Sequence, residues 1–137
     1  MITINTDGGA RGNPGRAAVG VYISDDKGKE LLAMGKTIGF ATNNVAEYRA
    51  VIEALEWVCE HKEQLEDTTI RFLLDSELVV MQLTGMYRVK NPVLQGLLFT
   101  IRTLESKMPF ALTYKHIPRA QNKKADALVN KALDNLL

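Results

Sequence analysis

The chain opens with the stretch that decides its fold, Ile2-Thr-Ile-Asn-Thr-Asp7-Gly-Gly-Ala-Arg-Gly-Asn-Pro-Gly15. Ile2, Ile4 and Thr6 alternate with polar residues, which is the period of a β-strand. The glycines after Asp7 permit a turn and the close approach of another backbone. We therefore expect Asp7 to lie at the tip of a central strand and to face a site. A long hairpin loop in which Asp7 is merely solvated is the alternative.

Two familiar glycine motifs are excluded by the residues at the end of this stretch and just after it. A Walker loop requires Gly-Lys-Ser or Gly-Lys-Thr at the start of a helix, but this loop ends in Pro14-Gly15-Arg16. A dinucleotide-binding fingerprint also runs into a helix, whereas residues 18–23 read Ala-Val-Gly-Val-Tyr-Ile and continue as a strand. A nucleotide-phosphate loop is therefore not expected here.

Length and composition indicate one globular domain that spans residues 1–137. The chain is 46% hydrophobic and 24% charged, with a net charge of +1, so any affinity for a polyanion must come from local placement of charge. The single cysteine, Cys59, excludes a disulfide framework. We find no signal peptide, no apolar run that could span a bilayer and no lipidation motif. A cytoplasmic monomer with no membrane contact and no obligatory protein partner is expected.

The pattern along the chain predicts an α/β fold with the order βββ-α-β-α-α-β-α. A stripe formed by Tyr48, Val51 and Leu55 is typical of an amphipathic helix, and Ser76 and Gly85 are start and stop signals of another. The expected strands cover residues 2–7, 18–24, 30–40, 70–74 and 110–114; the expected helices begin at 42–44, cover 77–84, begin at 91–92 and cover 123–137. The result is a five-stranded mixed sheet, an antiparallel meander plus parallel strands, flanked by helices.

Four acidic residues occupy positions that this topology would bring together. Asp7 and Asp75 each end a strand, and parallel neighbours would place both carboxylates at one edge of the sheet. Glu47 and Asp126 lie in the first turns of two helices. Carboxylates gathered in this way repel one another unless a cation lies among them, and oxygen ligands without Cys or His favour Mg²⁺ or Mn²⁺.

Each acid also has a purely structural explanation. Glu47 stands three residues after Asn44, which is the spacing of a capping box. Asp126 would favour the positive end of a helix dipole, and Asp75 could be a turn residue beside Ser76. Glu47 and Asp126, taken singly, fit the structural explanation better. The four together favour a site.

Four motifs in this order resemble those of the type 1 ribonuclease H family. They are Asp7-Gly-Gly-Ala-Arg-Gly-Asn-Pro-Gly15, Thr42-Asn-Asn-Val-Ala-Glu47, Asp75-Ser-Glu-Leu-Val79 and Pro118-Arg-Ala-Gln-Asn-Lys-Lys-Ala-Asp126. The resemblance covers essentially the whole chain. It implies the ribonuclease H-like fold and endonucleolytic hydrolysis of the RNA strand in RNA–DNA hybrids, leaving 5′-phosphate and 3′-hydroxyl ends.

The resemblance also assigns roles to residues. The catalytic and metal-binding acids are Asp7, Glu47, Asp75 and Asp126, with two Mg²⁺ ions, or Mn²⁺, as cofactors. A rigid strand makes Asp7 the best bridge between two metals, with Asp75 and Glu47 on one and Asp126 on the other. The implied substrate-binding residues are Gly9, Asn13, Thr42, Asn43, Asn44 and Glu77. Among them, the asparagines suit a 2′-hydroxyl and Thr42 a DNA phosphate; the alternative for the asparagines is turn and cap chemistry.

Three features depart from the family pattern. Glu77 replaces the substrate-contacting glutamine of many relatives; its carboxylate can still accept a hydrogen bond from a 2′-hydroxyl but would repel phosphate. Only Met-Tyr-Arg-Val-Lys separates Gly85 from Asn91, so the basic substrate-binding protrusion is missing and the chain resembles the compact form. His116 is the candidate for the relatives' mobile loop histidine, but it sits in the last strand pattern, where a structural role is the better explanation.

Two other functions compete with a hybrid-specific nuclease. A nucleic-acid-binding module of the same fold with weak or no turnover would explain Glu77 and the missing protrusion. It conflicts with the four acids, which a mere binder of a polyanion would gain from losing. A transposase or resolvase nuclease is disfavoured, because no additional DNA-binding segment is visible.

Overall fold

The computed structural model describes residues 1–65 and 69–137, and its element order confirms the predicted one. The strands are β1 (Ile2–Arg11), β2 (Gly15–Ser24), β3 (Glu30–Ala41), β4 (Thr69–Leu74) and β5 (Ala111–His116); the helices are α1 (Asn43–His61), α2 (Glu77–Leu83), α3 (Pro92–Ser106) and α4 (Lys123–Leu133), with short 3-10 turns at Lys62–Gln64 and Arg119–Gln121. None of these helices is both long and apolar enough to cross a bilayer.

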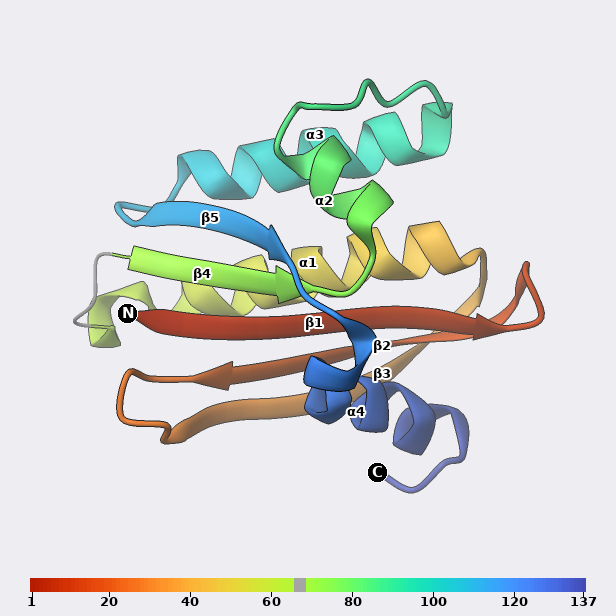
Figure 1. Cartoon of the computed structure of the whole chain (residues 1–137), viewed down its shortest axis with the longest axis horizontal. Helices are drawn as coiled ribbons and strands as arrows, with labels where there is room; N and C mark the ends of the chain where they lie inside the picture. The colour runs from red at the N-terminus through yellow and green to blue at the C-terminus, as the bar shows by residue number, and fades with distance from the viewer. Residues whose placement is uncertain (66–68) are drawn as a thin grey trace.

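The five strands form one mixed sheet in the order β3-β2-β1-β4-β5 (Figure 1). β1, β2 and β3 are antiparallel neighbours, whereas β4 runs parallel to both β1 and β5. The parallel pairing of β1 covers only residues 2–5, opposite 70–73 of β4. This arrangement confirms that the strands carrying Asp7 and leading into Asp75 are parallel neighbours.

The prediction that β1 ends at Asp7 is wrong. The strand continues to Arg11, because β2 pairs with it as far as Arg16 opposite Arg11. Asp7 therefore lies in the middle of β1. It still lies just beyond the last pair of the β1–β4 ladder, so its side chain reaches the end of the parallel part of the sheet, where α/β sites form.

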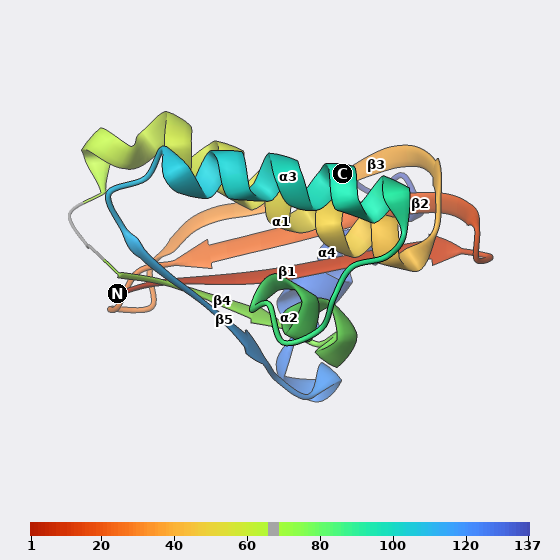
Figure 2. The ribbon, with the colours of Figure 1, turned by 90° about the horizontal axis from the view of Figure 1, so that it is seen from above.

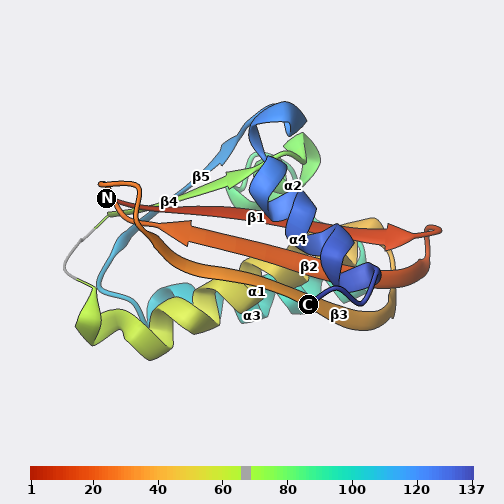
Figure 3. The same cartoon turned by 90° about the horizontal axis from the view of Figure 1, so that it is seen from below.

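Helices cover the two faces of the sheet unequally. α1 packs on β1 and β2 and lies beside α3, so these two long helices form a layer over one face (Figure 2). α4 crosses the opposite face and packs on β1, β2 and β3 (Figure 3). The core under α1 and α3 contains large, fully buried side chains, among them Tyr48, Phe72, Leu55, Ile4 and Ile101. α4 ends at Leu133, four residues before the predicted end.

Two glycines bring the acid-bearing helices close to the sheet. A Cβ added at Gly8 would lie 2.2 Å from the carbonyl carbon of Ala46 on α1. A Cβ added at Gly20 would lie 2.3 Å from the Ala125 oxygen on α4. Both approaches are shorter than real Cβ contacts, so a side chain at either position would push a helix away. These contacts set the distance of Glu47 and Asp126 from Asp7.

Candidate active site

Asp7 and Glu47 share a hydrogen-bond donor at the centre of the site. The backbone N–H of Gly8 donates to Asp7 Oδ1 at 3.0 Å and to Glu47 Oε1 at 2.7 Å. Both residues are buried, with exposed fractions of 8% and 6%. One N–H group therefore holds two carboxylates side by side without neutralising either.

Glu47 is not part of a capping box. α1 begins at Asn43, and its N-cap is Thr42, whose Oγ1 accepts from the Val45 N–H at 3.2 Å. Glu47 thus lies beyond the first turn, which corrects both its predicted place and the capping role suggested for Asn44. Its carboxylate turns toward β1 instead of the start of its own helix.

Asp75 completes a group of three acids. It directly follows β4, and Ser76 caps α2 by accepting from the Val79 N–H at 3.3 Å, as predicted. Asp7, Glu47 and Asp75 each offer one carboxylate oxygen, and these oxygens lie within 4.8 Å of one another. Three converging oxygen ligands can bind a metal cation.

Asp126 faces the same hollow from the first turn of α4, a position confirmed by the structure. All four acids line this hollow of about 370 Å³, but Asp126 stands apart from the close group of three. Its Oδ1 lies 3.4 Å from Nη2 of Arg119, an exposed side chain at the rim of the hollow. No sequence pattern singled out Arg119, although it stands beside Pro118 within the fourth motif.

Burial perturbs the acids strongly. Removal from water raises the pKa of Asp7 from its ordinary value of 3.8 to about 6. Burial also raises the pKa of Glu47 well above its usual range, and the neighbouring Asp7 adds to this. Glu47 Oε2 has no hydrogen-bond partner among the described residues. A buried, unpartnered carboxylate oxygen beside two other acids is the environment that a cation would relieve.

The predicted substrate-binding residues divide into three groups. Gly9, Asn43 and Asn44 line the acidic hollow. Asn13, Thr42 and Asn44 line an adjoining hollow of about 340 Å³. Glu77 lies on α2, is highly exposed and lines neither hollow.

Hydrogen bonds connect the loops that carry these residues. Asn13 Oδ1 accepts from the Asn43 N–H at 3.0 Å, and Asn43 Oδ1 accepts from the Ala10 N–H at 2.8 Å. The two asparagines therefore fasten the β1–β2 turn to the start of α1. His116 ends β5, with its Nδ1 3.9 Å from Glu77 Oε2. Its place at the end of a regular strand is the one that the sequence pattern predicted, and its structural role stays a prediction.

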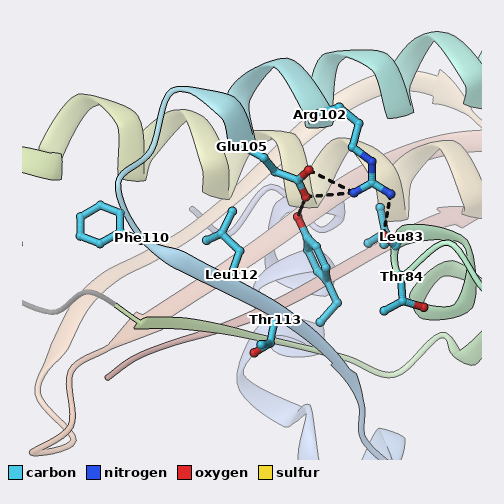
Figure 4. A pocket seen from close by; sticks show the side chains of 8 residues that line it. Leu83, Thr84, Arg102, Glu105, Phe110, Leu112 and Thr113 are labelled. Atoms are coloured by element: carbon cyan, nitrogen blue, oxygen red, sulfur yellow. Dashed lines mark hydrogen bonds and ion pairs between the residues drawn. The ribbon is translucent and has the colours of Figure 1, made fainter.

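A second polar group lies in a separate hollow of about 530 Å³ between α3 and β5 (Figure 4). Arg102 Nη1 lies 3.1 Å from both oxygens of Glu105, and the Tyr114 hydroxyl donates to Glu105 Oε2 at 2.5 Å. Arg102 Nη2 also donates to the Leu83 carbonyl at 2.6 Å. Burial, with Glu105 alongside, raises the pKa of Tyr114. Because these partners satisfy one another, this group ties α3 to β5 and α2.

Known proteins are similar to this chain in sequence and in fold. A family described as "Reverse transcriptase-like" matches residues 5–132. The chain is 41% identical to the "Bifunctional protein Rv2228c" of Mycobacterium tuberculosis over 97% of its own length, but it spans only 35% of that relative. It is 43% identical to the "Ribonuclease HI" of Halobacterium salinarum, covering 94% of this chain and 62% of that protein. The crystal structure of LC11-RNase H1 in complex with an RNA/DNA hybrid superposes with a TM-score of 0.93 at 45% identity, covering 98% of each chain.

The mixed five-stranded sheet, with one acid in the middle of β1 and another directly after β4, defines a ribonuclease H-like domain. Within that class, the chain belongs to the type 1 ribonuclease H family. It has the compact form, because residues 84–91 join α2 to α3 without an intervening helix.

Proposed function

We propose that this chain is an endoribonuclease that hydrolyses the RNA strand of RNA–DNA hybrids and leaves 5′-phosphate and 3′-hydroxyl ends. The observation that carries the proposal is the convergence of three carboxylates within 4.8 Å, with Asp126 lining the same hollow. A buried like-charge group destabilises a fold, so its presence indicates a chemical use. The relatives named ribonuclease HI and RNase H1 support the same reaction.

The proposed cofactors are two Mg²⁺ ions, with Mn²⁺ as a substitute. Asp7 would contact both ions, Glu47 and Asp75 would hold one, and Asp126 would hold the other. The unpartnered Glu47 Oε2 fits this assignment, since a hard cation prefers carboxylate oxygens. When bound, such ions activate a water and neutralise the departing oxygen of a phosphodiester. The chain itself supplies the orientation: the Gly8 N–H donates to both Asp7 and Glu47, and the first turn of α4 carries Asp126 at the same hollow.

Recognition of the hybrid is assigned to groups beside the acids. Asn43 Oδ1 already accepts from Ala10, which leaves its NH₂ group to donate to a sugar hydroxyl. Thr42 Oγ1 accepts from Val45, so the hydroxyl proton can donate to a phosphate oxygen of the DNA strand. Gly9 has no side chain, so the RNA strand can approach the floor of the hollow there. Asn13 and Asn44 would lie beside a ribose of that strand. We assign Glu77 a 2′-hydroxyl contact at the exposed edge.

The proposed unit is a single ribonuclease H domain of residues 1–137 that acts as a monomer on hybrid duplexes. A cytoplasmic location stays a prediction of the sequence. Neither point changes the chemistry assigned to the four acids.

The decisive assay is cleavage of a labelled RNA–DNA hybrid beside matched duplex DNA, duplex RNA and single-stranded RNA, each with Mg²⁺ and with EDTA. We expect cuts in the RNA strand of the hybrid alone, and only with Mg²⁺. Hybrid binding without any cleavage would establish the binding-module alternative instead.

The asparagines are tested separately from the metals. Asn43→Ala and Asn44→Ala should slow cleavage of an all-RNA strand more than cleavage of strands with single deoxy substitutions around the cut. One lost hydrogen bond should cost about 0.5–1.5 kcal/mol. Asn44→Ala is a clean probe because Thr42, not Asn44, caps α1. An equal loss on every substrate would show that these amides do not read the sugar.

A further inference from the structure

Asn122 is a buried polar residue to which the proposed mechanism gives no role. It directly precedes α4 and has an exposed fraction of only 1%. Asparagine at the start of a helix ordinarily caps it with its side chain, but here the side chain makes no capping hydrogen bond. Its backbone carbonyl instead begins the helix by accepting from the Asp126 N–H at 3.1 Å. The side chain of Asn122 is therefore available for hydrogen bonds to residues outside α4.

The side chain of Asn122 points into the sheet beside the acids. Its Nδ2 donates to the Thr6 carbonyl at 3.0 Å and to Asp75 Oδ2 at 3.1 Å. Its Oδ1 accepts from Asn5 Nδ2 at 3.1 Å. The Thr6 carbonyl can only accept, so the NH₂ group must face it, and the Asn5 amide secures that orientation from the other side.

These contacts join three of the four acids through one residue. Thr6 precedes Asp7 on β1, immediately after the last pair of the β1–β4 ladder. Asp75 is held directly, and Asp126 is held through the first backbone hydrogen bond of α4. With one oxygen of Asp75 bonded to Asn122, the other oxygen is free to turn toward Asp7 and Glu47.

We propose that Asn122 is a positioning residue that fixes the Asp75 carboxylate for cation binding and links it to Asp7 and Asp126. This inference rests on the proposed function, because it assumes that the acidic group binds a divalent cation. Asn122 is too buried to touch a hybrid, so its effect must pass through Asp75. Partners that orient a ligating carboxylate typically change metal affinity or activity by about 10–100-fold when they are removed.

The test compares Mn²⁺ binding by calorimetry in the wild-type chain, Asn122→Ala and a matched control, Asn91→Ala. Asn91 caps α3 by accepting hydrogen bonds from the N–H groups of Val93 and Leu94, and it lines the adjoining hollow but not the acidic one, so it is a control for Mn²⁺ binding and not for hybrid cleavage. Both variants should lower the melting temperature. Only Asn122→Ala should weaken Mn²⁺ binding, by about 10–100-fold. It should also lower kcat on a hybrid while KM stays near the wild-type value.

A purely structural role for Asn122 predicts a different result. Asn122→Ala would then bind Mn²⁺ as tightly as the wild type at a temperature where both are folded, and that result would overturn the proposal. Failure of the wild type to bind Mn²⁺ would overturn it as well. A wild type that binds Mn²⁺ but cuts no hybrid would refute the proposed function alone, because the affinity ratio would still measure positioning.

Two measurements keep the proposal testable if Asn122→Ala does not fold. Asn122→Leu keeps the branched shape of the side chain but has neither the NH₂ donor nor the carbonyl acceptor, and it should weaken Mn²⁺ binding as strongly. In the wild type, the side-chain amide resonances of Asn122 should shift during a Mg²⁺ titration, while those of Asn91 stay in place. Unchanged Asn122 resonances at saturating Mg²⁺ would contradict the link to Asp75.

Discussion

The acidic hollow and the Arg102–Glu105–Tyr114 group differ in whether their charged side chains have partners of opposite charge. In the hollow, Asp7, Glu47 and Asp75 converge as like charges, and burial raises the pKa of the first two. Between α3 and β5, the Glu105 carboxylate accepts hydrogen bonds from the Arg102 guanidinium and from the Tyr114 hydroxyl. The second group stabilises the fold because each member satisfies another. The acidic group opposes folding, because its like charges repel one another. Its presence therefore indicates a role in a reaction and not a role in stabilising the fold.

The largest effect should come from Asp7→Asn. This variant should abolish Mg²⁺-dependent hybrid cleavage, because it removes the acid placed to contact both cations. Its melting temperature without metal should equal or exceed that of the wild type, since one of several clustered charges is lost. Cleavage assays and thermal melts in EDTA measure the two effects. Near-normal turnover would refute the site assignment.

Glu105→Gln should show the reverse pattern. The amide keeps the shape of the side chain but loses the charge that faces Arg102 and the Tyr114 hydroxyl. We expect a loss of about 1.5–3 kcal/mol in the free energy of unfolding, as for hydrogen bonds to charged groups. Hybrid cleavage at a temperature well below melting should be unchanged. A large loss of cleavage in a fully folded sample would mean that the two regions are coupled.

The pH dependence of stability should separate the metal-free and metal-bound chain. The folded-state pKa of Asp7, about 6, lies above its ordinary value of 3.8, so the folded chain binds more protons between these values. In EDTA, the contribution of this group to the free energy of unfolding should therefore rise by about 1–3 kcal/mol as the pH falls from 7 to 4. Saturating Mg²⁺ should reverse the trend, since protons compete with the cation. Asp7→Asn, titrated in parallel, should lose most of the rise.

The smallest effect should come from Tyr114→Phe. Only the hydroxyl is removed, and Glu105 keeps Arg102 as its partner. The free energy of unfolding should fall by about 0.5–1.5 kcal/mol, the net value of one hydrogen bond. Urea unfolding at constant pH measures this loss. A decrease larger than that of Glu105→Gln would show that the tyrosine, not the arginine, dominates this group.

Features with a local signal in the sequence could be predicted. The order of strands and helices follows from the period of apolar residues, and Ser76 and Gly85 mark the ends of α2 where the structure has them. The parallel placement of Asp7 and Asp75 followed from topology.

Features that depend on distant partners could not be predicted. The choice of Thr42 over Asn44 as the cap, and the turn of Glu47 toward Gly8, are decided by the packing of α1 on β1. The extension of β1 to Arg11 depends on pairing with β2. The contacts of Asn122 with Asn5 and Thr6 join residues more than a hundred positions apart, for which no periodic pattern exists.

The position of β1 at the centre of the sheet has a kinetic consequence. Its hairpin with β2 closes a short loop, whereas its ladder with β4 closes a much longer loop that contains β2, β3 and α1, and α4 comes from the far end of the chain. The acids therefore meet only after most of the sheet has assembled, so a cation finds no complete site in a partly folded chain. We expect Mg²⁺ to slow unfolding while leaving the refolding rate nearly unchanged. For this domain the metal would stabilise the folded state after it has formed and would not take part in the folding nucleus.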